Sequence, residues 1–168
     1  MQLEEAKKQF ISAWGTFSSN WGINRTMAQI HALLLVSPEP VSADEVMLQL
    51  NISRGNANMN LRDLINWRLI SRVVLPGERR EYFVAEKDIY KVAATIVKER
   101  KKRELEPMLQ FLQGISQVEG DKNDKAVKTY TNTLEGIRKL GEQADKTLDK
   151  MIRAEENWFW NAMIHLVG

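Results

Sequence analysis

Residues 52–85 read ISRGNANMNLRDLINWRLISRVVLPGERREYFVA, and this stretch contains the most informative pattern for the fold. Its first part carries apolar residues three or four positions apart, which is the spacing of one buried helix face; they are Ala57, Leu61, Leu64 and Ile65. Its second part has two β-branched and aromatic runs, 70–75 and 80–84, on either side of a Pro-Gly-Glu-Arg turn. The stretch therefore predicts a helix over about 53–68, followed by a β-hairpin.

The residues before this stretch predict the rest of a helix-turn-helix. Apolar periodicity predicts helices over 3–21 and 25–36, and two prolines end the second. Ser42 lies three residues before an acid, which is the capping-box spacing, and it opens a short helix over about 43–49. Ser53 is the expected N-cap of the next helix. Helix, short helix, turn, longer helix and hairpin is the order of a winged helix-turn-helix.

The residues after the hairpin are predicted to be helical as well. A 3.6-residue period runs from 87 to about 105, where Pro107 ends or kinks the helix. Apolar residues from 126 to 166 follow steps of three and four, typical of a helix–helix seam. Gly136 or Gly141 could divide that segment into two helices.

The predicted fold class is therefore mainly α: a winged helix-turn-helix with a two-stranded β-hairpin wing and long N- and C-terminal dimerisation helices. We divide the chain into an N-terminal dimerisation helix, 1–22, a winged helix-turn-helix module, 23–86, and a helical linker and dimerisation region, 87–168. A two-stranded hairpin alone is marginal in water, so its side chains should pack back on the module; the candidates are Val73, Leu75, Tyr82 or Val84.

Composition excludes several classes of function. The 168 residues contain no cysteine, which removes disulfides, thiolate metal sites and cysteine nucleophiles. The two histidines are far apart, and His31 lies in an apolar helix as an expected core residue. There is no glycine-rich phosphate loop and no Ser/His/Asp grouping. We therefore expect no catalytic residue, no metal, no cofactor and no membrane span, and a cytoplasmic protein.

Charge is distributed unevenly although the chain is nearly neutral, with 24 basic and 22 acidic residues. Residues 53–80 hold six arginines and only two acids, so the basic excess is concentrated on the predicted helix and hairpin. A second basic run, 98–103, has five positive residues out of six. Such a run is usually a solvated helical face; the alternative is a phosphate-contacting or linker surface.

The predicted 53–68 helix carries residues suited to DNA on the face opposite its apolar residues. Gly55, Met59 and Arg62 point most nearly away from the core, with Asn56 and Asn58 on the flanks. Asparagine can pair with adenine, arginine with guanine and an exposed methionine with the thymine methyl group. Glycine in the first turn lets the backbone approach a phosphate. The alternative is that these residues only solvate a surface helix, although glycine and asparagine lower helix propensity.

Residues 52–85, together with EKDIYKVAATIVKERKKRELEP at 86–107, resemble the GbsR-like branch of the MarR-type winged-helix transcriptional regulators. The resemblance covers roughly residues 20–110. It implies a dimeric cytoplasmic DNA-binding regulator, usually a repressor, with a recognition helix in the major groove and the wing at 76–80 on the backbone or minor groove. The predicted DNA-contacting residues are Ser42, Ser53, Arg54, Gly55, Asn56, Asn58, Met59 and Arg62, with Arg79 and Arg80 on the wing.

Aromatic residues concentrate near the two ends of the chain, and they have two interpretations. Trp14, Phe17, Trp21, Trp158 and Phe159 are expected to form a dimer core, since the resemblance implies dimerisation through the terminal helices. Alternatively they line an effector pocket. The resemblance implies a choline- or betaine-like effector, which an aromatic cage would bind through cation–π attraction.

Two functions follow from these patterns. The first is a sequence-specific DNA-binding transcriptional regulator, a dimeric repressor with a double-stranded DNA operator as its partner. The second is a protein-interaction adaptor built on a winged-helix scaffold without DNA binding. The exposed arginines distinguish them, because an adaptor has no need to present Arg54, Arg62, Arg79 and Arg80 together.

Overall fold

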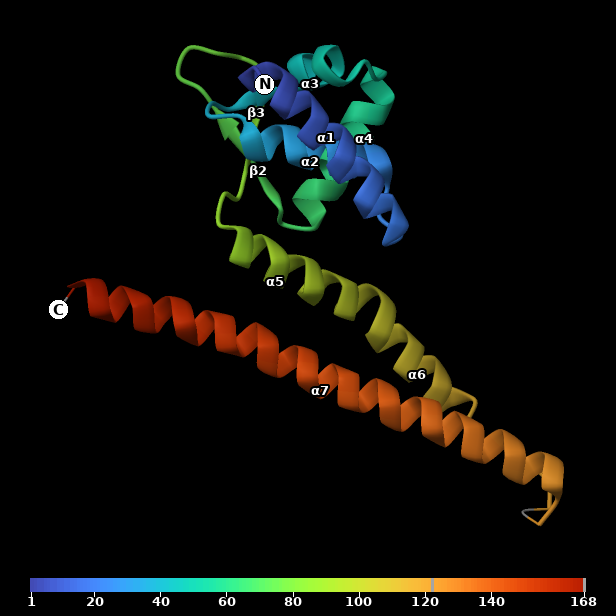
Figure 1. Cartoon of the computed structure of the whole chain (residues 1–168). Helices are drawn as coiled ribbons and strands as arrows, with labels where there is room; N and C mark the ends of the chain where they lie inside the picture. Colours follow the sequence, from blue (N-terminus) through green and yellow to red (C-terminus); the bar gives the residue numbers. More distant parts are fainter. Residues whose placement is uncertain (122, 168) are drawn as a thin grey trace. The chain divides into compact units, whose positions relative to one another are not determined.

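A computed structural model describes the backbone of residues 1–121 and 123–167, and the side chains of these residues up to 153. The chain divides into two compact units, 1–92 and 93–168 (Figure 1). The first unit holds all the elements of the winged helix-turn-helix. The second consists of helices alone in its described part.

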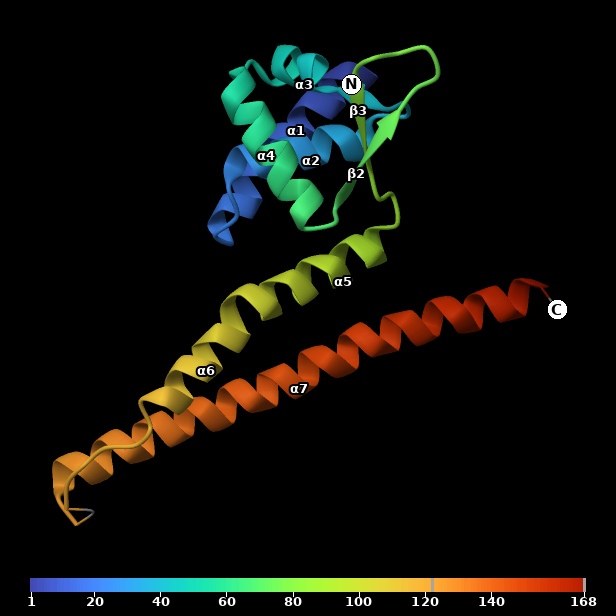
Figure 2. The same cartoon turned by 180° about the vertical axis from the view of Figure 1, so that it is seen from behind.

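The first unit contains four helices and a small sheet in the predicted order. Its elements are α1 (Leu3–Asn20), α2 (Arg25–Val36), β1 (Val41–Ser42), α3 (Ala43–Leu50), α4 (Arg54–Asn66), β2 (Ile70–Val74) and β3 (Glu81–Ala85). Figure 2 shows the loop between β2 and β3 projecting from the body of the unit. The predicted winged helix-turn-helix is confirmed.

The sheet has three strands rather than the two predicted. The short strand β1 pairs with β3, which lies in the centre of the order β1-β3-β2. The inward-facing positions are Ile70, Phe83 and Ala85, which are buried, whereas the predicted Tyr82 and Val84 are only half-buried. Successive strand residues face opposite sides, so the prediction chose the wrong face of β3.

Side-chain caps set where the helices begin, as predicted. The Ser42 hydroxyl accepts a hydrogen bond from the Glu45 amide, and the Glu45 carboxylate accepts one from the Ser42 amide, forming the capping box of α3. The Ser53 hydroxyl accepts from the Asn56 amide and caps α4. Helix α4 ends at Asn66, before the predicted end, because Arg68 adopts a left-handed conformation with φ 59°.

The core of the first unit lies between α2, α3 and α4. Its most deeply buried apolar side chains are Ile30, Leu34, Val46, Leu61 and Leu64. They come from three helices that are each apolar on one face, and burying such faces together is the main source of stability in a small domain. The core therefore fixes α4 by one face and leaves its other face outward.

Two long helical segments make up the described part of the second unit. Helix α5 (Ile89–Arg100) starts in the first unit and continues through a π-helical segment (Lys101–Leu105) into α6 (Glu106–Gly114). Pro107 lacks an amide hydrogen and its ring clashes with the preceding turn, which accounts for the local widening of the helix. Helix α7 (Lys125–Val167) is a single helix of 43 residues, about 64 Å long.

Neither glycine divides α7, and Gly141 has a packing role. A Cβ added there would lie 2.7 Å from Leu109 Cδ2 of α6, so glycine permits the two helices to approach closely. Figure 1 shows α6 running alongside the first half of α7. In the described part of the chain, no helix combines the length and the apolar character that crossing a bilayer requires.

Candidate nucleic-acid interface

Helix α4 presents a polar face to solvent opposite its buried face. Ala57, Leu61 and Leu64 are buried, while Met59 is 53% exposed and Arg62 is exposed. At Gly55 an added Cβ would meet no atom within 4 Å, so the backbone of the first turn is open. Ser53 and Asn58 are exposed as well, whereas Asn56 is half-buried. The predicted division of α4 into a buried face and an outward face is confirmed.

Arg54 in the first turn of α4 links this helix to α3. Its guanidinium Nη2 lies 3.4 Å from the Asp44 carboxylate, and both side chains are more than half exposed. An exposed ion pair of this kind contributes little free energy, because water competes for both groups. Arg54 therefore remains available to a phosphate, since leaving Asp44 costs little free energy.

The wing loop carries two exposed arginines, Arg79 and Arg80, beyond a turn at Gly77 with φ 80°. Next to this loop, Arg72 of β2 pairs with Glu81 of β3 at 2.8 Å. The pKa of Glu45 is lowered, mainly by hydrogen bonds from Ser42 and to a smaller extent by the charge of Arg80.

Ser42 does not belong to the exposed set, and its prediction as a DNA contact is corrected. The residue is 4% exposed and pairs with Tyr82 in the sheet. Its amide and its hydroxyl both donate to Glu45 Oε2 at 2.7 Å. Burial in β1 and the capping box commit its side chain to the fold.

Asn60 is the residue of α4 that sequence analysis missed. It is 1% exposed although asparagine is usually a surface residue. Its amide nitrogen donates to the backbone oxygen of Asn56 at 2.8 Å and to Asn56 Oδ1 at 2.7 Å. Its position was the available signal, since Asn60 lies three residues after Ala57 and four before Leu64, at the margin of the buried face.

The second basic run, 98–103, is not simply a solvated face. The Lys101 side chain is 13% exposed and lies 2.9 Å from the Asp149 carboxylate and 3.1 Å from that of Asp145. The hydrogen bond with Asp149 is the largest cause of the raised pKa of Lys101. Lys101 thus joins the π-helical segment to α7 inside the second unit. Lys98 and Lys102 remain exposed.

The aromatic residues of α1, and Trp21 at its C-cap, do not enter the core of their own unit. Phe17 is 65% and Trp21 is 74% exposed, whereas Trp14 is half-buried with its ring centroid 5.5 Å from that of Phe10. The side chains of Trp158 and Phe159 lie outside the described residues. Phe17 and Trp21, four residues apart and both exposed, form an outward stripe, which we call the α1 aromatic stripe.

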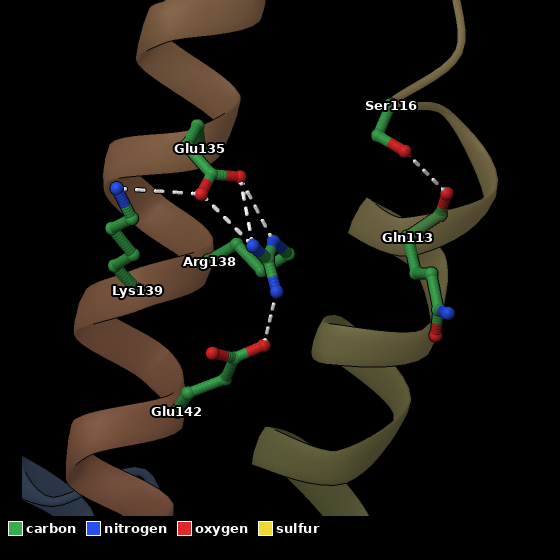
Figure 3. A network of polar contacts seen from close by, with 6 residues as sticks. All are labelled: Gln113, Ser116, Glu135, Arg138, Lys139 and Glu142. Atoms are coloured by element: carbon green, nitrogen blue, oxygen red, sulfur yellow. Dashed lines mark hydrogen bonds and ion pairs between the residues drawn. The ribbon is translucent and has the colours of Figure 1, made fainter.

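A groove of about 390 Å³ lies between α6 and α7 in the second unit. Its lining residues are Leu112, Ser116, Thr131, Asn132, Leu134, Glu135 and Arg138. Figure 3 shows the Arg138 guanidinium held by carboxylates of its own helix, at 2.9 Å from Glu135 and in contact with Glu142. The same hydrogen bond lowers the pKa of Glu135. Because its charge is matched by these carboxylates, Arg138 is not poised to receive an anion.

His31 is a core residue, as predicted. It is 3% exposed, and burial lowers its pKa to about 4, with the nearby charge of Lys87 as a second cause. Lys87 donates to the carbonyl oxygens of Leu34, Leu35 and Ser37 at 2.6 to 2.9 Å and so caps the end of α2. Among the described residues, no group of three or more acidic and histidine side chains is arranged to hold a metal.

Comparison with known proteins gives a partial match in sequence. The chain is 32% identical to the HTH-type transcriptional regulator MmpR5 of Mycobacterium tuberculosis over 76 residues, which are 45% of this chain and 46% of that protein. The chain thus spans less than half the length of the curated relative it matches. No family model matches the sequence.

Comparison of structures shows the fold. A transcriptional regulator of known crystal structure has a TM-score of 0.70 and 19% identity, covering 90% of this chain and 99% of that chain. A MepR variant of S. aureus bound to an oligodeoxyribonucleotide has a TM-score of 0.41 and 17% identity, covering 80% of this chain and 92% of that chain. The match at a TM-score of 0.70 shows that the chain shares the fold of a known transcriptional regulator, and its sequence is similar to part of MmpR5.

Proposed function

We propose that the chain is a sequence-specific DNA-binding transcriptional regulator. The observation that carries the proposal is the outward face of α4, where Gly55, Met59 and Arg62 are exposed on a helix whose opposite face is buried. A helix of this kind fits the major groove, and the residues of its first turns reach base edges. The name of the matched relative, a helix-turn-helix transcriptional regulator, agrees with this function.

The wing supplies the second element of the proposed contact. Arg79 and Arg80 are exposed beside the turn at Gly77, where long cationic side chains reach phosphates or the minor groove. In the proposal, α4 reads sequence and the wing anchors the protein. The predicted helix-face contacts are Ser53, Arg54, Gly55, Asn56, Asn58, Met59 and Arg62.

The proposed regulator acts as a homodimer and a repressor in the cytoplasm. Helix α7 supports the dimer, because it has an exposed stripe in steps of three and four beside the stripe that packs on α6; its larger members are Tyr130, Ile137, Leu140 and Met151. An exposed apolar heptad stripe favours pairing with a second helix. The α1 aromatic stripe, with Phe17 and Trp21 exposed, provides further apolar surface for the same assembly.

Two more specific parts of the proposal rest on the resemblance of residues 52–107 to a branch of the MarR-type regulators. They are the GbsR-like branch and a choline- or betaine-like effector. Phe17 and Trp21 could contribute to a cation-binding cage only if a second copy or another segment closes over them, since both are exposed.

Selection of DNA by the purified protein tests the proposed function. A pool of random duplexes is enriched over several rounds, and binding sites are mapped on the chromosome of the source organism. We expect one two-fold-symmetric motif, with half-sites about 10 bp apart or a multiple of this distance. A protein with Arg62, Arg79 and Arg80 replaced by alanine is the control and should enrich nothing. Failure of the unmodified protein to enrich any motif would favour the adaptor.

A further inference from the structure

Two asparagines one turn apart in α4 form a hydrogen-bonded pair. The Asn60 Nδ2 donates to the backbone oxygen of Asn56 at 2.8 Å and to Asn56 Oδ1 at 2.7 Å. Asn60 is 1% exposed, and its Oδ1 has no partner among the described residues. Asn56 is half-buried in the first turn, so one end of its amide is directed inward and the other is left for solvent or a ligand.

The backbone carbonyl oxygen of Asn56 determines the orientation of both side-chain amides. A carbonyl oxygen can only accept, so the group of Asn60 beside the Asn56 carbonyl must be its NH₂ donor. The second hydrogen of that NH₂ group needs an acceptor, so Asn56 turns its oxygen toward Asn60. The amide nitrogen of Asn56, with two N–H donors, is consequently the end directed away from Asn60.

We propose that Asn60 is a positioning residue that makes Asn56 present a hydrogen-bond donor to DNA. This inference rests on the proposed function, in which α4 enters the major groove. There, guanine offers the acceptors O6 and N7 and thymine offers O4, whereas cytosine offers the N4 donor. Asn56 then favours guanine or thymine over cytosine at the position it contacts. Bidentate pairing with adenine, expected for a free asparagine, needs the oxygen that Asn60 holds.

Because Asn60 is buried with an unpaired oxygen, we expect it to position Asn56 without stabilising the fold. An amide buried with an unpaired oxygen is unfavourable for folding, because that oxygen has lost its hydrogen bond to water. Alanine is also the better helix former. Asn60→Ala should therefore fold with a thermal midpoint equal to or above that of the unmodified protein, so a change in DNA recognition would not reflect unfolding.

The test measures binding to the selected duplex with all four bases placed in turn at each position. Asn56→Ala first identifies the position that Asn56 contacts, as the one where base preference disappears. There we expect the unmodified protein to prefer guanine or thymine to cytosine by about fivefold or more. Asn60→Ala should reduce this preference to about twofold or less, because the freed amide can turn either end outward. Asn66→Ala is the matched control and should leave this preference intact, since Asn66 is exposed near the C-terminal end of α4 and lies outside the proposed contacts.

Asn56→Asp provides an independent test that leaves Asn60 in place. One carboxylate oxygen can still accept from Asn60 Nδ2, and the other becomes an outward acceptor. The preference at the same position should then reverse toward cytosine, whose N4 donates. This reversal cannot be produced by a general loss of folding.

The outcomes distinguish the proposal from the function on which it rests. Unchanged base preference in Asn60→Ala, or an equal loss of affinity for all four bases, would overturn the positioning role. The positioning role would also be overturned if Asn56→Ala kept its base preference at every position of the duplex. The same holds if Asn56→Asp did not reverse the preference toward cytosine. If the unmodified protein binds every duplex equally or not at all, the proposed function itself is wrong.

Discussion

Substitution of Gly55 should change stability and DNA binding in opposite directions. A Cβ at this position would meet no atom within 4 Å, so a leucine side chain can be accommodated without displacing a neighbour. In a helix, glycine is about 0.5–1 kcal/mol less favourable than alanine, and leucine is close to alanine. Because Gly55 lies in the first turn, we expect Gly55→Leu to stabilise the unit by about 0.5 kcal/mol and raise its melting temperature by roughly 2–4 °C.

The same leucine should interfere with DNA. In the proposed complex, the open backbone of the first turn approaches a phosphate or base edge, and a side chain of about 5 Å would keep the helix out of the groove. We expect the affinity for the selected duplex to fall at least tenfold, or about 1.4 kcal/mol. Fluorescence anisotropy measures the affinity, and circular dichroism measures the melting temperature of the same sample.

Gly136 is the matched control, since a Cβ there also meets no atom within 4 Å and the residue lies within α7. Gly136→Ala should gain stability by the same helix-propensity effect and keep DNA affinity. Should Gly55→Leu bind the selected duplex within about twofold of the unmodified protein while folding normally, a different face of the winged helix must contact DNA.

Three further predictions follow from the described side chains. Arg62→Ala should cost about 1–3 kcal/mol of binding free energy on the selected duplex and remove the base preference at one position. Arg80→Ala should weaken binding to selected and random duplexes alike and make the slope of log K against log salt shallower by about one. Titrations at several salt concentrations distinguish the two effects. Burial lowers the pKa of His31 to about 4, so the free energy of unfolding should be highest above pH 6.5 and fall by about 3 kcal/mol as the pH falls toward 4, where the buried imidazole becomes protonated. Urea unfolding of His31→Leu should not show this part of the pH dependence. Leu140→Glu should yield monomers in sedimentation, whereas its exposed neighbour Lys139→Glu should leave the dimer intact; equal behaviour of both variants would contradict an α7 interface.

The parts of the fold that could be predicted from sequence are those decided by local spacing. The buried face of α4 follows from Ala57, Leu61 and Leu64 alone, because helical periodicity places them together wherever the core lies. The caps Ser42 and Ser53 follow likewise, since each bonds to a backbone amide three residues away. These interactions depend on the chain's own neighbouring residues and need no knowledge of distant ones.

The parts that could not be predicted depend on contacts between distant residues. Strand β1 has only two residues, too few to show a period, and it exists because β3 pairs with it. Lys101 resembles a surface lysine in the sequence, and only its approach to Asp145 and Asp149 of α7 removes it from solvent. Asn60 is a different case, because its partner Asn56 is only one turn away: its spacing from Ala57 and Leu64 indicated the margin of the buried face, whereas its residue type indicated the surface. Polar burial of this kind is set by the partner and not by residue type.

In the proposed function, the outward face of α4 reads double-stranded DNA and the wing anchors the protein on it. The most direct test is a paired titration of the purified protein with its selected duplex and with a scrambled duplex of equal length, over a range of salt concentrations. We expect much tighter binding to the selected duplex than to the scrambled one. The logarithm of the binding constant for both duplexes should fall with log salt, with a slope of about −0.9 per phosphate contacted. Equal affinity for the two duplexes, or affinity that does not change with salt, would contradict the proposed function.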